Sequence, residues 1–463
     1  MLEVATRARA ASLIMRSSSA SSRNAALSVL SDLLSERSGA LTEANAIDLE
    51  SARVSGLDSA VTKRLVLDAN KVRSLREGLS ALISMDDPLG VETLARELSP
   101  GLELRRLTCA LGVIGVVFEA RPEAVIQIAA LAIKSGNAVI LKGGKEAAAS
   151  NAALGTAVAD ALRAAGLPSD AAQMVASREE LSALLQHDTL IDLVIPRGSA
   201  ALVKAVKAAT RIPVLGHADG ICHVYLAPSA DKDIAARVVC DSKINYPAAC
   251  NAAETLLIDE AVPQEVVETV ARALLTAGVT LHVDTASAPV FVATRAALLL
   301  EEGVAVDAVG LVIDAVKADW DTEWLALHMS VARVANVVEA IAWVNRHGSH
   351  HTDAVVCRAG GDGDVAGAAF VAGVDSASVF VNASTRFADG FRFGFGAEVG
   401  VSTGRIHSRG PVGVDGLLTY RYQLVGEGHV VAQFNAGKGE ADIWIAGQTL
   451  PTLAYTHVTR SGR

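Results

Sequence analysis

One cysteine stands where a nucleophile would be expected. Cys250 lies in the segment YPAACN at 246–251, and the apolar residues 255–258 that follow predict a buried strand. A thiol in a short turn at the mouth of such a strand is held rigidly and can still face a cleft, which attack on a carbonyl carbon requires. A cysteine considered alone is more often a small buried hydrophobic residue. The other motifs favour the nucleophile.

A first glycine-containing turn suits a phosphate. Residues 141–146 read LKGGKE and stand between a predicted strand and a predicted helix. Gly143 and Gly144 let a ligand approach the backbone, the helix N-terminus favours an anion, and Lys142 and Lys145 supply positive charge. The alternative is a surface turn with solvated lysines. The position at the carboxyl end of a strand favours the ligand site.

A second turn repeats this context. Residues 195–200 read IPRGSA, with Arg197, Gly198 and Ser199 between a strand and a helix. Two such turns on consecutive crossovers predict a dinucleotide that carries an extra phosphate. The segment GFGAEVG at 394–400 has the wrong spacing for a dinucleotide fingerprint and does not follow a strand, so it is rejected as one.

Arginines interleave with phenylalanines in the segment NASTRFADGFRFG at 382–394. Ser384, Thr385, Arg386 and Arg392 are candidates for binding an anionic substrate, because arginine binds carboxylate or phosphate bidentately and apolar rings strengthen such contacts by excluding water. The alternative for each arginine is a structural network that fixes the loop.

Two further motifs have competing interpretations. Arg121, in Glu119-Ala120-Arg121-Pro122 at the end of the predicted strand 113–118, would stabilise an oxyanion or a leaving phosphate, or else pair with a neighbouring glutamate. The histidines at 347, 350 and 351 lack good metal-ligand spacing, so no metal site is predicted there.

Composition bounds the class of protein. Hydrophobic residues make up 51% but aromatic residues only 4%, so the core is built from aliphatic side chains, as in layered α/β enzymes. The formal charge of −10 argues against nucleic acid as a main partner. The five cysteines form no CxxC pair, which favours free thiols in a reducing compartment, and no apolar run reaches the roughly 18 residues of a membrane span. A cytoplasmic protein is expected.

The N-terminal segment 1–31 has two interpretations. Its arginines, serines and single glutamate mimic an organellar transit peptide, and such targeting stays open. It also has the pattern of an amphipathic helix, which we favour because there is no obvious cleavage point. The expected core positions are Ala10, Leu13, Ile14, Ala26, Leu27 and Leu30.

The elements that must position these residues follow one another regularly. Residues 3–85 are predicted to be helical, with helix starts at Ser31-Asp32 and Thr42-Glu43, and residues 102–110 form an exposed strand. Strands and helices alternate from 113 to 226 and again from 233 to 382, which predicts doubly wound parallel sheets. A polar break is expected at 361–368, a long ordered loop at 382–416, and a strand-rich arm at 417–463 that pairs with another subunit.

Together these segments resemble the gamma-glutamyl phosphate reductases of the aldehyde dehydrogenase superfamily, above all the reductase half of bifunctional pyrroline-5-carboxylate synthases. The resemblance covers nearly all of residues 5–430. It rests on 117–122, 141–146, 195–199, 213–223, 247–254 and 382–413. It implies an NADP-binding domain at 1–236, to which the strand 102–110 adds part of an oligomerisation element, a catalytic domain at 237–410 and an oligomerisation arm at 411–463.

The resemblance also implies the chemistry. NADPH would reduce L-glutamyl 5-phosphate to glutamate 5-semialdehyde through a Cys250 thioester, in proline biosynthesis. The Cys250 amide, with Arg121 or Asn245, would stabilise the oxyanion, and Glu323 would hold the nicotinamide ribose. Lys145 stands where many NAD-dependent relatives have glutamate, which favours NADP. Hydrolytic relatives carry an acid in the segment LGHA at 215–218, and this chain has none there.

Two alternatives remain open from the sequence. One is NAD(P)-dependent oxidation of a semialdehyde to the acid, and the other is a catalytically silent partner of a glutamate kinase. The chain has no kinase half of its own, so a separate kinase is a possible partner. A homodimer or higher homo-oligomer is expected.

Overall fold

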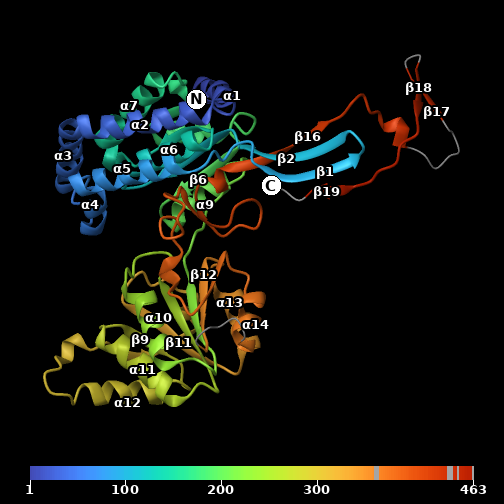
Figure 1. Ribbon diagram of the computed structural model, residues 1–463. Coiled ribbons are helices and arrows are strands. Elements are labelled where there is room, and N and C mark those ends of the chain that lie inside the picture. The colour runs from blue at the N-terminus through green and yellow to red at the C-terminus, as the bar shows by residue number, and fades with distance from the viewer. Residues whose placement is uncertain (359–363, 435–441, 446–447, 461–463) are drawn as a thin grey trace. The chain divides into compact units, whose positions relative to one another are not determined.

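The computed structural model describes residues 1–358, 364–434, 442–445 and 448–460 (Figure 1). The chain forms two compact units. The first comprises 1–194, 210–213 and 414–463, and the second comprises 195–209 and 214–413. This division differs from the expected boundary after residue 236, because the strand Cys222–Leu226 pairs with strands of the second unit. In the described part of the chain, the helices are too short or too polar to span a bilayer.

The first unit begins with helices and continues into a small sheet. Its helices are α1 Leu2–Met15, α2 Ala20–Glu36, α3 Ser38–Val54, α4 Ser59–Leu65, α5 Ala69–Ser84, α6 Ala124–Lys134, α7 Ala148–Ala164 and α8 Arg178–Leu184. Its central sheet has the order β5-β4-β3-β6, from β3 Val113–Phe118, β4 Ala138–Lys142, β5 Ala172–Val175 and β6 Leu193–Arg197. β3, β4 and β5 are parallel, and β3 and residues 138–141 of β4 are apolar, as in buried crossover strands.

A second sheet in this unit forms an arm. It has the order β16-β2-β1-β19, with the strands β1 Glu92–Ser99, β2 Leu102–Ala110, β16 Leu418–Val425 and β19 Val458–Arg460, which Figure 1 shows side by side. All pairs are antiparallel. β17 Asp442–Ile445 and β18 Gln448–Pro451 form a separate pair. The predicted strand 102–110 is therefore confirmed, whereas β1 was missed.

The second unit is a parallel sheet covered on both faces. Its sheet has the order β10-β9-β11-β8-β7-β12-β13, from β7 Cys222–Leu226, β8 Ala253–Asp259, β9 Thr280–Val283, β10 Val312–Asp314, β11 His328–Val334, β12 Thr352–Val356 and β13 Ser378–Val381. Its helices are α9 Ala200–Ala209, α10 Lys232–Ile244, α11 Gln264–Thr276, α12 Ala288–Leu298, α13 Val337–His347 and α14 Val365–Gly373. A short pair, β14 Gly400–Ser402 and β15 Gly410–Val412, follows.

Alternating strand residues build two cores in this unit. Leu256 and Ile258 of β8 pack with residues of α10, α11 and α12, whereas Leu257 packs with residues of α13 and α14. Successive side chains of a strand point to opposite faces, so helices lie on both sides of the sheet. The predicted doubly wound α/β fold is confirmed.

Several local predictions were wrong. Ser31-Asp32 and Thr42-Glu43 lie inside α2 and α3, because α2 already starts at Ala20, where the Ser19 hydroxyl accepts a hydrogen bond from the Ser22 amide at 3.0 Å. The N-terminus is helical as favoured, and Ala26, Leu27 and Leu30 are buried. Ala10, Leu13 and Ile14 are exposed, because the turn at 16–19 interrupts the helical phase. α1 buries Ala5, Ala8 and Met15 instead.

The remaining differences concern loops. Residues 365–368 of the expected polar break begin α14, which the Asp364 carboxylate caps, whereas 361–363 lie outside the described residues. The expected loop 382–416 is irregular but contains β14 and β15. β10 and β11 were also missed.

Candidate active site

Cys250 occupies a tight turn between α10 and β8, as predicted. Backbone bonds from the Ala249 amide to the Tyr246 carbonyl and from the Ala252 amide to the Ala249 carbonyl close the turn at 3.1 and 2.9 Å. The buried Cys222 thiol donates to the Cys250 carbonyl at 3.3 Å, and burial raises the pKa of that thiol well above its ordinary value. Cys222 is therefore a structural donor, and the half-buried Cys250 keeps its side chain available.

Gly220 packs its backbone directly against this turn. A Cβ atom at Gly220 would lie 2.1 Å from the Cys250 carbonyl oxygen and 2.6 Å from the Cys250 Cα. No real Cβ atom approaches backbone so closely, so only glycine fits without displacing Cys250. The Gly220 amide donates to Glu323 Oε1 at 2.9 Å, which ties Glu323 to the same turn. Burial raises the pKa of Glu323 above its ordinary value, although this hydrogen bond opposes the shift.

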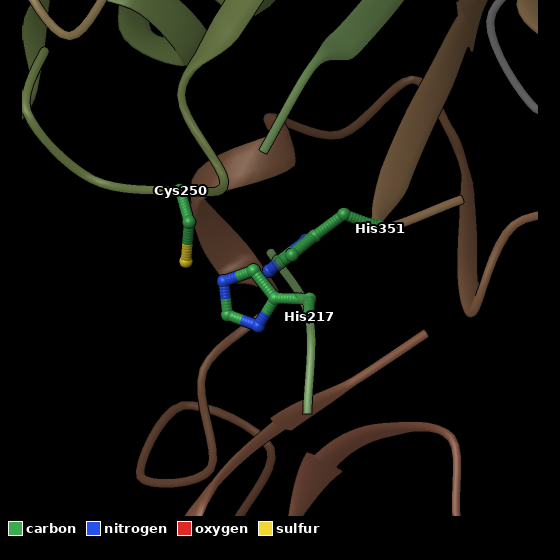
Figure 2. A group of neighbouring side chains, drawn as sticks. All are labelled: His217, Cys250 and His351. Carbon is green, nitrogen blue, oxygen red and sulfur yellow. The ribbon is translucent and has the colours of Figure 1, made fainter. Parts of the chain in front are cut away.

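Two histidines face Cys250, and sequence reasoning missed both. Figure 2 shows the side chains of His217 and His351 directed toward the thiol. One nitrogen of each ring and the Cys250 sulfur all lie within 4.8 Å of one another. His217 Nδ1 lies 3.0 Å from the Val401 carbonyl, which leaves Nε2 for the thiol. The sequence did contain an indication of His217, because the segment 215–218, which has no carboxylate, has a histidine instead.

His351 has different contacts from the histidines near it in the sequence, His347 and His350. Its side chain is 1% exposed, and the His217 and His351 rings meet edge to face at 4.8 Å between centroids. His347 Nδ1 instead contacts Asp321 at 2.7 Å, and His350 Nδ1 contacts the Asp375 carbonyl at 2.8 Å. In the sequence, His347, His350 and His351 were treated as one group, and no metal site was predicted there. The structure separates the three and places His351 beside His217 and Cys250.

The arginine loop is fixed near Cys250. Ser242 Oγ on α10 donates to Ser384 Oγ at 3.2 Å and accepts from the Thr385 amide at 3.1 Å. The side chain of Asn251, which follows Cys250 in the sequence, donates to the Ala388 carbonyl at 2.9 Å. The loop therefore holds two points of the Cys250 segment. The predicted residues Ser384, Thr385 and Arg386 lie together here.

Arg386 is a cation with spare binding capacity. Burial lowers the pKa of its guanidinium, the neighbouring Arg392 lowers it further, and Cys250 acts in the opposite direction. Its Nε is buried and has no hydrogen-bond partner among the described residues. Arg392 is exposed and donates to the Arg386 carbonyl at 2.5 Å, so it fixes the backbone of the loop. An anion beside Cys250 would pair with the guanidinium of Arg386.

A buried ion pair lies beneath the site. Lys243 Nζ on α10 and Glu254 Oε2 on β8 are 2.5 Å apart, and both side chains are 0% exposed. Burial lowers the pKa of Lys243 and raises the pKa of Glu254 to about 7. Glu254 Oε1 also accepts from the Leu325 amide at 3.3 Å. The pair thus joins both ends of the Cys250 segment to the loop that carries Glu323.

Asn245 has its partner on its own helix. It is exposed, and its Nδ2 donates to Asp241 Oδ1 at 3.3 Å. A role at the oxyanion stays a prediction for this residue.

The lysine loop belongs to the first unit, where it meets the turn that contains Arg121. Because β3 and β4 are parallel neighbours, the turn after Phe118 and the loop after Lys142 leave the same edge of the sheet. Glu146 Oε1 accepts from the Ala120 amide at 2.6 Å and holds Ala120 at φ +43°, a strained value for alanine. Arg121, Lys142 and Lys145 thus share one region.

The glycines of this loop lie against side chains. A Cβ at Gly143 would lie 2.2 Å from Asn151 Nδ2, and one at Gly144 would lie 1.9 Å from Glu146 Oε1. The glycine requirement is therefore at least partly structural. A bare backbone at the carboxyl end of a strand also fits a phosphate.

The second predicted turn lies in the second unit. Arg197 Nη1 donates to the Glu398 carbonyl at 3.2 Å, and Nη2 lies 3.9 Å from Glu398 Oε1. Ser199 Oγ accepts from the Leu202 amide at 3.4 Å at the start of α9. Gly198 is exposed between them. Cofactor binding by these residues stays a prediction.

Known proteins resemble this chain throughout its length. The family profile described as Aldehyde dehydrogenase family matches residues 2–301. Gamma-glutamyl phosphate reductase of Synechococcus sp. (strain WH7803) is 47% identical over 415 residues, 90% of each chain. The enzyme of the same name from Prochlorococcus marinus (strain MIT 9313) is 45% identical over 95% of each chain. The crystal structure of gamma-glutamyl phosphate reductase from Thermotoga maritima superimposes with a TM-score of 0.85 at 32% identity and covers 93% of this chain and 99% of its own.

Proposed function

Because the chain belongs to the gamma-glutamyl phosphate reductases of the aldehyde dehydrogenase family, we propose that it reduces L-glutamyl 5-phosphate to L-glutamate 5-semialdehyde and phosphate. The observation that carries this proposal is the half-buried Cys250 thiol, with the imidazole of His217 and the partly buried cation Arg386 beside it. This group of residues suits attack on an anionic acyl carbon. The aldehyde product carries an amine in the same short chain and cyclises toward proline.

The first half of the reaction uses a nucleophile and an anion site. Cys250 Sγ forms a bond to the acyl carbon, the bond from that carbon to the phosphate oxygen breaks, and phosphate leaves. Arg386 stabilises negative charge on the substrate as it approaches the thiolate. The Cys250 amide stabilises the oxyanion, with Arg121 or Asn245 as the proposed second donor. Ser384 and Thr385 would complete the substrate site. Hydrogen bonds from the Ser242 hydroxyl to Ser384 Oγ and from the Thr385 amide to Ser242 hold both residues in place.

His217 moves the proton. With Nδ1–H donated to the Val401 carbonyl, Nε2 is an acceptor and takes the Cys250 thiol proton before attack. The imidazolium that forms lies beside the thiolate and stabilises it. In the second half it returns the proton to the thiolate when the carbon–sulfur bond breaks and the aldehyde leaves.

The reductant we propose is NADPH, which supplies the hydride when bound. The residues fit such a group, since the loop 142–145 leaves a strand with two glycines and exposes Lys145. Lys142 and Lys145 would pair with phosphates, the latter with a ribose 2′-phosphate. Gly143 and Gly144 would let the cofactor approach the backbone. Arg197, Gly198, Ser199 and Glu323 would complete the site.

The main rival is oxidation of a semialdehyde to the acid. The sequence argued against it because hydrolytic relatives have an acid at 215–218. His217 weakens that argument, because a histidine beside the thioester can also activate water. The two functions differ in one reactant. Phosphate resolves the thioester in the reverse of the proposed reaction, and water resolves it in the rival reaction.

The test is therefore the reverse reaction with phosphate present or omitted. Purified protein receives glutamate semialdehyde, in equilibrium with its cyclic form, and NADP. We expect NADPH to appear only with phosphate, and Cys250→Ser to abolish its formation. The matched control is Cys240→Ser, because Cys240 lies on α10 and its thiol contacts only the Ala273 carbonyl among the contacts described, at 3.9 Å. Turnover without phosphate would establish the rival, and no turnover by a folded protein would favour a silent partner of a kinase.

The arm supports a separate proposal on assembly. We propose that β16 pairs with a second copy of the chain, because it is an edge strand whose residues 419–425 are exposed on both faces. Unpaired edge strands favour pairing with another chain. Sedimentation of a chain shortened to end at residue 417 should then show a smaller assembly than the full chain. An unchanged assembly would exclude β16 as the interface.

A further inference from the structure

Three side chains at Cys250 have the chemistry of a zinc site. His217, Cys250 and His351 each offer one ligand atom, and these atoms lie within 4.8 Å of one another (Figure 2). Two imidazole nitrogens and one thiolate are the ligands that zinc prefers, whereas magnesium and calcium prefer oxygen. The mechanism proposed above uses Cys250 and His217 and gives no role to His351.

His351 provides an independent sign of a ligand. Its side chain is 1% exposed, and its Nε2 is buried with no hydrogen-bond partner among the described residues. Leaving a buried polar nitrogen unpaired costs about 1–3 kcal/mol, so such an atom calls for an explanation. Figure 2 shows the ring directed toward His217 and the thiol. A metal ion bound between them would satisfy the nitrogen.

The outer nitrogens of both rings are already fixed. His217 Nδ1 lies 3.0 Å from the Val401 carbonyl, and His351 Nδ1 lies 2.8 Å from Thr352 Oγ1. Metal-binding histidines typically use one ring nitrogen for the metal and hydrogen-bond the other, which sets the tautomer and the ring orientation. Both rings here therefore present Nε2 inward with the orientation that a ligand needs.

We propose that His217, Cys250 and His351 bind Zn²⁺, and that the bound ion reversibly blocks the active site. Tetrahedral zinc with Zn–S of about 2.3 Å and Zn–N of about 2.0–2.1 Å requires ligand atoms roughly 3.4–3.6 Å apart. The ligand atoms lie within 4.8 Å of one another and need to close by about 1 Å, which we expect from rotation of the half-buried Cys250 side chain and small shifts of the two rings. Binding forms the Zn–S bond and releases the thiol proton to solvent.

The consequence for turnover is direct. A thiolate bound to zinc no longer attacks an acyl carbon, and His217 no longer accepts its proton. Arg386 is the positive group near Cys250 and opposes the ion electrostatically. The site therefore should not hold zinc as firmly as a structural site does, which suits reversible inhibition. Zinc and the anionic substrate would compete.

A spectroscopic test needs no substrate and stays separate from the proposed activity. Co²⁺ is added to the metal-free full chain, and absorption by thiolate-to-cobalt charge transfer is recorded. We expect a band that saturates at one ion per chain, disappears in Cys250→Ser, and is removed by equimolar Zn²⁺. His351→Gln should weaken the apparent affinity at least about tenfold, the lower end of the loss seen even for outer-shell partners of a metal.

Matched variants keep the test decisive. His350→Gln changes the adjacent histidine, whose Nδ1 contacts the Asp375 carbonyl and lies outside the cluster, and should leave the band unchanged. If the buried His351 variant fails to fold, His217→Gln at the half-buried position should weaken the band equally. In kinetic assays Zn²⁺ should inhibit the protein, and EDTA should restore the activity. His351→Gln should raise the half-inhibitory concentration of Zn²⁺ at least about tenfold. A missing band, or a band insensitive to both histidine variants, would overturn the proposal.

Discussion

Gly220→Ala should inactivate the protein while leaving it folded. The new Cβ would lie 2.1 Å from the Cys250 carbonyl oxygen, whereas ordinary contact begins near 3.4 Å, so the two must separate by at least 3.4 − 2.1 = 1.3 Å. The atoms in the way are backbone atoms of the nucleophile's own turn, and no flexible side chain can yield instead. Misplacement of a reacting group by about 1 Å costs roughly 100-fold in rate, about 2.7 kcal/mol of barrier.

Gly216→Ala is the matched control in the same segment. Its Cβ would meet nothing closer than the Pro196 carbonyl oxygen at 3.4 Å, so its backbone need not move. We expect kcat/KM of Gly220→Ala to fall about 100-fold and that of Gly216→Ala to stay within about twofold. Iodoacetamide labelling of Cys250, which needs no substrate, should change only in Gly220→Ala, while both variants keep native circular dichroism. An active Gly220→Ala would refute the argument that this backbone contact fixes the nucleophile.

Three further predictions address the ion pair, the cofactor loop and the anion site. Lys243→Met leaves Glu254 buried without its cation and should destabilise the protein by about 3–5 kcal/mol in urea unfolding, whereas adding Glu254→Leu should recover most of the loss. Burial raises the pKa of Glu254 above its unfolded value of 4.5, so ionising it costs stability as the pH rises; the Lys243→Met defect should therefore be smaller at pH 5 than at pH 8, and equal defects would contradict this origin. Lys145→Glu should lower kcat/KM for NADPH about tenfold and spare NADH, and a uniform loss for both would remove this lysine from the 2′-phosphate. Arg386→Lys should raise the substrate KM about tenfold or more with native circular dichroism, because a lysine cannot replace a bidentate guanidinium, and an unchanged KM would exclude this arginine from the anion site.

Local patterns predicted most of the fold. β3 is apolar throughout and β8 has an apolar centre, so the predicted strand ranges 113–118 and 255–258 lie within a few residues of the observed ones. β1, β10 and β11 were missed, and for β1 the physical reason is clear. β1, at 92–99, is a polar strand whose stability comes from pairing with β2 on one side and β19 on the other. Such long-range pairing leaves no local periodicity.

The N-terminal segment was correctly predicted to be helical, but the predicted buried face of α1 was wrong. The apolar residues of α1 and α2 were placed on one continuous stripe, but the turn at 16–19 resets the phase. Leu13 and Ile14 are 54% and 53% exposed, while Ala5, Ala8 and Met15 are fully buried. Alanine carries little hydrophobic signal, so the sequence favoured Leu13 and Ile14 over the buried Ala5 and Ala8.

Only part of the candidate site was predicted from the sequence, because the residues around Cys250 lie at the amino ends of strands. Ligands of open α/β sheets are expected beyond the carboxyl ends of the strands, and the loop after Lys142 in the first unit follows that rule. His217, Cys250 and His351 instead lie just before the amino ends of β7, β8 and β12, which are consecutive and parallel in the order β8-β7-β12.

Strand order explains why these three residues meet. In the sequence His217, Cys250 and His351 are separated by 33 and 101 residues. β7 and β8 follow one another along the chain, but β12 comes four strands after β8 and still pairs with β7. Only once β12 pairs with β7, and β7 with β8, do the residues before each strand share one edge. Glu323 precedes β11, the neighbour of β8 on the other side, and reaches the same turn through Gly220. Cys250, the proposed nucleophile, can therefore be predicted from its own motif, whereas its proposed base His217 becomes apparent only from the order of the strands.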